Sequence, residues 1–126
     1  MTKEQKKFKC LILADLKIAI SIYADSDKAM RLLAAYHVQQ AIEKTIKLKA
    51  EIEGLNLWGH NIGELIKNCD DAKLDIGIPS WIRNNARSVT GWEAECRYYP
   101  IKSVRKDTIK KAYDLTREWL ESGKTK

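Results

Sequence analysis

Apolar residues recur at three- and four-residue steps along most of the chain, a spacing that places them on one face of a helix. Five segments have this pattern, four of them long and one short: 3–24, 28–53, 61–70, 79–99 and 102–121. Only two prolines and six glycines are present, which leaves little room for long loops. The pattern therefore predicts an all-α fold of four long helices and one short helix.

Capping residues mark where these helices begin and end. The segment 25–27, Asp-Ser-Asp, breaks the first pattern and supplies an N-cap, because a short side-chain oxygen accepts free backbone N–H groups. Gly54 is the residue best able to adopt the left-handed conformation that follows a helix. Asn61 and Glu64 have capping-box spacing, and Pro79 suits a first helical turn. These positions separate the five predicted helices.

Length, charge and cysteine content limit the class of protein. The 126 residues suffice for one domain, 1–126, that buries its core without disulfides or metal. A net charge of +6 attracts anions such as phosphates or nucleic acid, although dispersed lysines also serve solubility. Three separated cysteines without a Cys-x-x-Cys pair favour a reducing compartment. Since no apolar stretch suits a signal peptide or membrane span, we expect a cytoplasmic protein without membrane contact.

The long second helix has an apolar seam and a separate polar face. The seam is formed by residues 34, 38, 41, 45, 48 and 52. The opposite side carries Tyr36, Gln40, Glu43 and Lys47, with His37 and Lys44 beside them. In one interpretation, Glu43 and Lys47 form a solvated ion pair worth roughly 0.2–0.5 kcal/mol. In the other, this face lines a polar groove or dimer seam where the lysines meet phosphate.

Asp15 interrupts the apolar stripe of the first helix. That stripe is formed by Phe8, Leu11, Ile12, Ala19 and Ile22. Burying an unpaired carboxylate is costly, so we predict a partner from another helix, either Lys44 or Arg97. The alternative is that Asp15 lies at the edge of the stripe and reaches water.

The end of the fourth predicted helix combines charge with aromatic rings. Glu93 and Arg97 have a favourable order for an ion pair, and Tyr98 and Tyr99 follow before Pro100. An arginine and two tyrosines at a helix exit suit a phosphate and a base, through bidentate bonding and stacking. A simple salt bridge is the alternative.

The remaining chemistry-bearing residues have structural explanations. We expect His60, at the start of the third helix, to cap or pack rather than catalyse. The tryptophans are expected to be core or interface anchors: Trp58, Trp81, Trp92 and Trp119. No acidic cluster at metal-ligand spacing, glycine-rich phosphate loop or nucleophile elbow occurs, so we predict no metal, cofactor or catalytic residue.

Three segments resemble the HEPN family, the higher eukaryotes and prokaryotes nucleotide-binding domain. They are residues 36–47 (YHVQQAIEKTIK), residues 60–66 (HNIGELI) and Arg97-Tyr98 before a proline. Helix order and chain length agree, and Asp15 matches an acidic residue in the first helix. The resemblance implies an up-and-down helical bundle, usually dimeric, found alone or beside a minimal nucleotidyltransferase in toxin–antitoxin pairs.

Some HEPN members are metal-independent ribonucleases whose motif is an arginine followed after four to six residues by histidine. The positions required after Arg97 hold Lys102, Ser103 and Val104 instead, so the histidine is missing. Arg31 and His37 match the spacing, but a six-residue step places helical side chains about 120° apart. We interpret that match as coincidence, and an enzyme is not favoured.

We therefore expect a homodimeric HEPN-like module, in a prokaryotic toxin–antitoxin-like system, that binds a nucleotide, RNA or a partner nucleotidyltransferase. The candidate ligand-binding residues are Tyr36, Gln40, Lys44, Lys47, Arg97 and Tyr98. The candidate supporting polar residues are Asp15, Glu43 and His60. Two alternatives stay open. One is a divergent ribonuclease toxin using Arg97 with a displaced histidine, and the other is an interaction subunit without a ligand.

Overall fold

The computed structural model of the chain describes residues 1–93 and 104–122. Within these residues the regular secondary structure is helical, without strands, as the apolar pattern predicts. The helices are α1 (Lys3–Ile22), α2 (Lys28–Ile52), α3 (Ile62–Asp71), α4 (Ser80–Asn84), α5 (Ala86–Thr90) and α7 (Lys106–Leu120).

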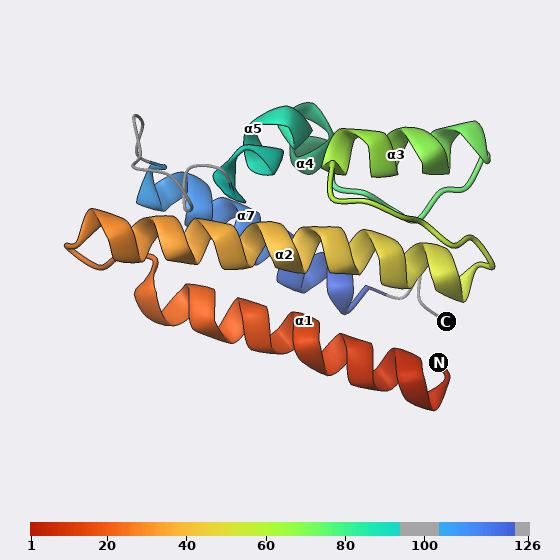
Figure 1. Cartoon of the computed structure of the whole chain (residues 1–126), viewed down its shortest axis with the longest axis horizontal. Coiled ribbons are helices and arrows are strands. Elements are labelled where there is room, and N and C mark those ends of the chain that lie inside the picture. Colours follow the sequence, from red (N-terminus) through yellow and green to blue (C-terminus); the bar gives the residue numbers. More distant parts are fainter. Residues whose placement is uncertain (94–103, 123–126) are drawn as a thin grey trace.

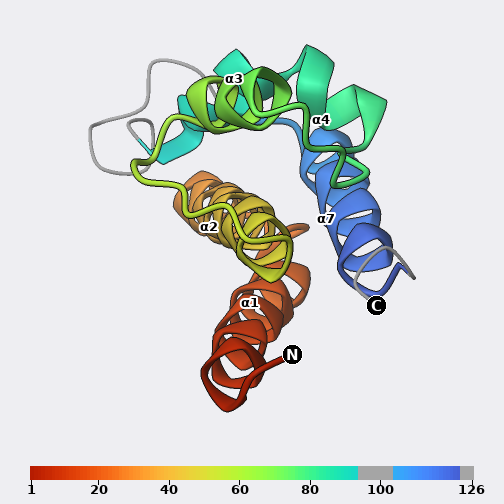
Figure 2. The same cartoon turned by 90° about the vertical axis from the view of Figure 1, so that its right-hand side faces the viewer.

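Helix α2 lies at the centre of the arrangement. It runs antiparallel to α1, and α3, α4 and α5 lie along its other side (Figure 1). Helix α7 crosses behind α2, as the side view in Figure 2 makes clear. Three sides of α2 therefore contact other helices.

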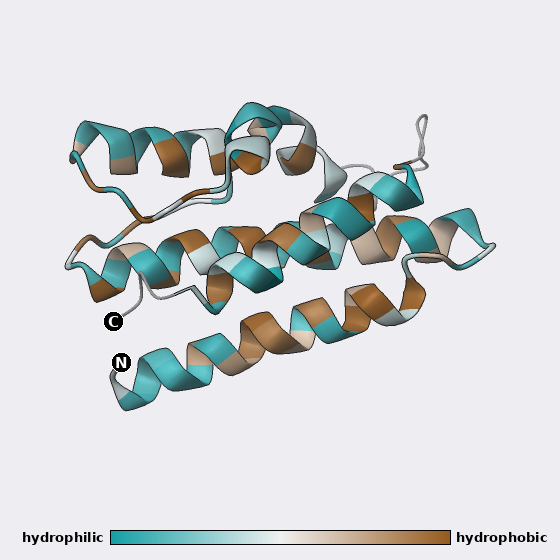
Figure 3. Ribbon diagram, turned by 180° about the vertical axis from the view of Figure 1, so that it is seen from behind, coloured by the Kyte–Doolittle hydropathy of each residue, from teal (hydrophilic) through white to brown (hydrophobic). Residues whose placement is uncertain are grey.

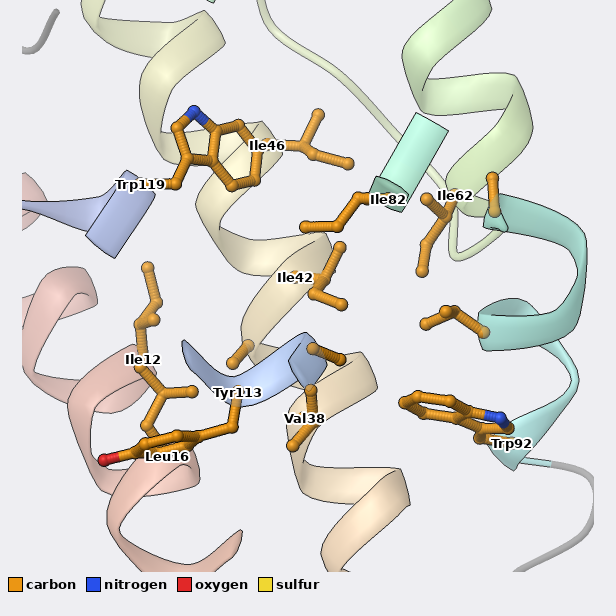
Figure 4. Close-up of a cluster of buried hydrophobic side chains, with 14 of the residues drawn as sticks. Ile12, Leu16, Val38, Ile42, Ile46, Ile62, Ile82, Trp92, Tyr113 and Trp119 are labelled. Carbon is orange, nitrogen blue, oxygen red and sulfur yellow. The ribbon is translucent and has the colours of Figure 1, made fainter. Parts of the chain in front are cut away.

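The core is built around the apolar seam of α2, much as predicted. The residues at positions 34, 38, 41, 45 and 48 are buried. Figure 4 shows Val38, Ile42 and Ile46 of α2 in the middle of the core, with α1 and α7 side chains on one side and residues from the α3–α5 region on the other. The labelled side chains are Ile12, Leu16, Val38, Ile42, Ile46, Ile62, Ile82, Trp92, Tyr113 and Trp119.

The end of α2 has the geometry expected of Gly54. This glycine has a φ of +91°, which L side chains rarely adopt. Its N–H donates to the carbonyl of Glu51 at 2.9 Å, and the N–H of Leu55 donates to the carbonyl of Ala50 at 2.9 Å. These two bonds form a Schellman motif, which satisfies carbonyls at the helix end and turns the chain back.

The predicted helix over 79–99 is wrong in its described part. Two short helices, α4 and α5, replace it and are separated at Asn85, where φ is −115° and ψ is 16°. The carbonyl of Trp81 accepts from the Asn85 side chain at 2.8 Å and from the Asn85 backbone N–H at 3.0 Å. The predicted start at Lys102 lies outside the described residues, and α7 begins at Lys106, after an extended Arg105.

The apolar stripe predicted for α1 is too wide. Leu11 is 55% exposed, because α1 packs against α2 and α7 on one side only and Leu11 lies beyond that contact. Figure 3 shows a hydrophilic N-terminal half of α1 and a more hydrophobic C-terminal half. None of the described helices is both long and apolar enough to cross a membrane.

Candidate functional site

One face of α2 is left uncovered by the other described helices. It points toward the viewer in Figure 1 and to the left in Figure 2, away from α7. We call this the open face of α2, and its half-buried residues are Tyr36, His37, Gln40, Lys44 and Lys47. At 100° per residue they span about 100° of the helix circumference. The four ligand-binding residues predicted on α2 therefore share one exposed strip.

Asp15 of α1 forms one edge of the open face. Lys44 donates from Nζ to Oδ2 of Asp15 at 2.6 Å, so one of the two partners predicted for this carboxylate is present. His37 donates from Nδ1 to Oδ1 at 2.9 Å. Asp15 is only 8% exposed, and both of its oxygens are satisfied. These three residues, the Asp15 cluster, join α1 to α2 and balance the charge of Lys44.

Glu43 is central to a second cluster, on the α3 side of α2. Its Oε1 accepts from Nδ1 of His60 at 3.0 Å, and its Oε2 accepts from Nε2 of Gln39 at 3.1 Å. The side chain of Glu43 is 2% exposed and that of His60 is 76% exposed. The interpretation of Glu43 and Lys47 as a solvated ion pair is therefore wrong, because the carboxylate is buried and bonds to His60 and Gln39 instead. Gln39, Glu43 and His60 form the Glu43 cluster.

Burial sets the acidity of Glu43. Removal of water raises the pKa of Glu43 above its ordinary value of 4.5, because the charged form loses hydration. Hydrogen bonds from His60 and Gln39, and the nearby charges of His60 and Lys47, oppose this rise without cancelling it. Lys47 is therefore close enough to Glu43 to act on it electrostatically, although it does not bond to the carboxylate as His60 does.

The Glu43 cluster is incompletely hydrogen-bonded within the part of the chain that the structure describes. The side-chain oxygen Oε1 of Gln39 is fully buried and accepts no hydrogen bond there. A buried acceptor without a partner costs free energy, which distinguishes this cluster from the satisfied Asp15 cluster.

Three open-face side chains keep unused polar groups. No hydrogen bond or ion pair joins the phenol of Tyr36, the amide of Gln40 or the ammonium of Lys47 to another described residue. The ring of Tyr36 contacts His37 edge-on, with 5.3 Å between centroids. The other two predicted ligand-binding residues, Arg97 and Tyr98, lie outside the described residues.

Arg31 and His37, which match the spacing of the ribonuclease motif, bond to different partners. Arg31 donates from Nη1 to the carbonyl of Asp25 at 2.7 Å and to that of Ser26 at 3.1 Å. His37 bonds to Asp15 instead. Arg31 therefore stabilises the turn between α1 and α2.

Sequence reasoning missed two contributions to this site and one exposed side chain near it. His37 was placed beside the polar face, yet it bonds to Asp15; its seven-residue separation from Lys44 puts both on one side of α2. Gln39 lies one turn before Glu43, a spacing that allows the observed bond. Trp58 was expected to be an anchor, but it is 84% exposed, so a core role is wrong.

Within residues 1–93 and 104–122, no three metal-binding side chains gather in a group.

Comparison with known proteins identifies the family. Residues 17–125 match the family model for the HEPN domain, a range that contains α2, α3, α7 and the whole open face. Curated proteins and solved structures give no match. The match covers most of the chain, and the family is one of nucleotide-binding and ribonuclease-type modules. The chain belongs to the HEPN family.

Proposed function

We propose that this chain is a nucleotide- or RNA-binding module whose ligand lies against the open face of α2. The observation that carries the proposal is the set of unused polar groups on Tyr36, Gln40 and Lys47, half-exposed on one strip. Unpaired hydrogen-bonding groups that share a surface favour a polar partner. Membership of the HEPN family makes a nucleotide or RNA the class of partner to test first.

Each side chain has a separate part in this proposal. Lys47 supplies a positive charge to a phosphate, since no described carboxylate bonds to it. Lys44 is balanced by Asp15, so it supplies a fixed hydrogen-bond donor rather than net charge. Gln40 and Tyr36 offer directional bonds to a base or ribose. Arg97 and Tyr98 remain predicted members of the site.

The test is binding of a labelled single-stranded RNA, measured by fluorescence anisotropy over a range of salt concentrations. Lys47→Gln should weaken binding and reduce the salt dependence of log K by about 0.7, the value for one lost phosphate contact on a single strand. The control is Lys111→Gln, which removes the same charge from an exposed position on α7. If wild type binds neither RNA nor nucleotides, the proposal is wrong.

A homodimer that associates with a minimal nucleotidyltransferase, in a toxin–antitoxin-like system, belongs to the same proposal. Its support is family membership, since HEPN domains often act as dimers. Sedimentation of the purified chain and its co-purification with such an enzyme would test these two assemblies separately.

A metal-independent ribonuclease is a second candidate, favoured by the geometry of His60. Glu43 holds Nδ1 of this exposed histidine, which leaves Nε2 available to take a proton from a ribose 2′-hydroxyl. RNA degradation by wild type that is lost in His60→Gln would support this activity. Intact RNA after incubation with wild type would exclude it.

A further inference from the structure

Among the described residues, Trp58 is far more exposed than the other large apolar side chains outside the core. It is 84% exposed, whereas Trp92 and Trp119 are buried. Its loop neighbours Leu55 and Leu57 pack against the core, so the exposure belongs to this one indole. An aromatic ring that contributes so little to packing suits contact with a partner molecule.

The loop that carries Trp58 is anchored at both ends. It leaves α2 through the bond from Leu55 to the carbonyl of Ala50, at 2.9 Å. It ends at His60, which bonds to Glu43 at 3.0 Å. Figures 1 and 2 show this yellow-green segment returning along α2 on the side away from α7, next to the open face. Trp58 is therefore held near the proposed ligand.

Trp58 and His60 lie on either side of a turn at Gly59, and both are exposed. Gly59, between them, has a φ of +102°, and a Cβ there would meet no atom within 4 Å. Backbone conformation, rather than crowding, thus accounts for glycine at this turn. The turn leaves the indole and the imidazole exposed two residues apart.

The surroundings of Trp58 favour a nucleic acid over a protein partner. His60 and Lys47 both lie close enough to Glu43 to act on it electrostatically. Proteins usually dock on a broader apolar patch, but in the part of the chain that the structure describes a single exposed indole stands beside cationic and hydrogen-bonding groups. Stacked bases with adjacent phosphates match that combination, because every base has a π-face.

We propose that Trp58 is a stacking platform for an unpaired base, with the neighbouring phosphate near Lys47 and His60. This inference rests on the proposed function and narrows its ligand to single-stranded RNA, because a duplex hides the base faces. Base stacking is sequence-tolerant, so the platform selects unpaired strands rather than a particular sequence.

The experiment compares anisotropy of a labelled short oligoadenylate with that of the same strand in a duplex. Trp58→Ala should weaken single-strand binding roughly tenfold or more, the effect of losing one stacked base. Trp58→Phe should retain most of the affinity, because a flat ring remains. Leu13→Ala is the control, since it removes an exposed apolar side chain from α1 on the side near Tyr113 and Arg117.

The outcomes separate this inference from the proposed function. Equal single-strand affinity in wild type and Trp58→Ala overturns the platform and leaves the open face as the binding site. Equal losses for single strand and duplex also overturn it, since stacking requires an unpaired base. No binding by wild type overturns both proposals. Urea unfolding of Trp58→Ala should match wild type, because the side chain is exposed, so a folding defect would be recognised.

Discussion

The Asp15 and Glu43 clusters use the same pair of groups in different surroundings. In each, a carboxylate accepts from Nδ1 of a histidine and joins α2 to a neighbouring segment. Asp15 also binds the ammonium of Lys44, whereas Glu43 binds the neutral amide of Gln39. A lysine therefore gives the second hydrogen bond to Asp15, whereas a neutral amide gives the second hydrogen bond to Glu43.

Because of this difference, the two carboxylates have different structural roles, although each bonds to a histidine. The Asp15 cluster requires a negative charge, because it compensates a lysine at the edge of the open face. The Glu43 cluster requires hydrogen-bond acceptors in a buried place, where charge itself is disfavoured. Substitutions that remove charge but keep shape should therefore affect the two clusters unequally.

The largest effect is expected from truncating Glu43. Glu43→Ala should lower the free energy of unfolding by about 3 kcal/mol, because it leaves a cavity and an unpaired Gln39 amide. Urea denaturation followed by circular dichroism measures this. The matched control, Glu43→Gln, should stay within about 1 kcal/mol of wild type, since it keeps shape and an acceptor. Equal losses of unfolding free energy in Glu43→Ala and Glu43→Gln would show that the negative charge of Glu43 is required for stability.

A smaller loss is expected when Asp15 loses its charge. Asp15→Asn should cost about 2 kcal/mol, the usual contribution of hydrogen bonds to charged groups. The same urea assay applies, with Lys44→Met and the double variant completing a cycle. A coupling free energy near zero between Asp15 and Lys44 would contradict a stabilising bond between these two side chains.

The smallest effect concerns pH. The folded chain keeps the Glu43 proton to higher pH than the unfolded chain, so its contribution to stability is full below pH 4.5 and is lost as pH rises through the raised pKa. Glu43→Gln lacks this loss. Its stability relative to wild type should therefore increase from pH 4.5 upward, as measured by urea unfolding at several pH values. A constant difference would indicate that the pKa of Glu43 is not raised.

Features governed by one helix, or by the cost of burying a charge, could be predicted from the sequence. The seam and end of α2 follow from periodicity and from Gly54. A partner for Asp15 from another helix follows from the need to pair a carboxylate within an apolar stripe, and Lys44 was one of the two candidates.

Features that depend on how distant segments pack could not be predicted in the same way. Glu43 occupies a position that looks polar on α2, but it is buried and bonds to His60, which comes from the loop before α3. The exposure of Trp58 depends on the path of that loop, and tryptophan alone favours burial. The break at Asn85 is a change of backbone direction that helical periodicity does not detect, because Ile78, Ile82 and Val89 keep helical spacing across it.

The position of Asp15 has a consequence for dividing this chain by homology. The HEPN match begins at residue 17, two residues after this carboxylate and within the span of α1. A fragment cut at that boundary would lose Ile12 and Leu16 from the core and leave Lys44 and His37 without their acceptor. The segment that matches the family model is therefore shorter than the segment that α1 needs in order to pack against the rest of the domain.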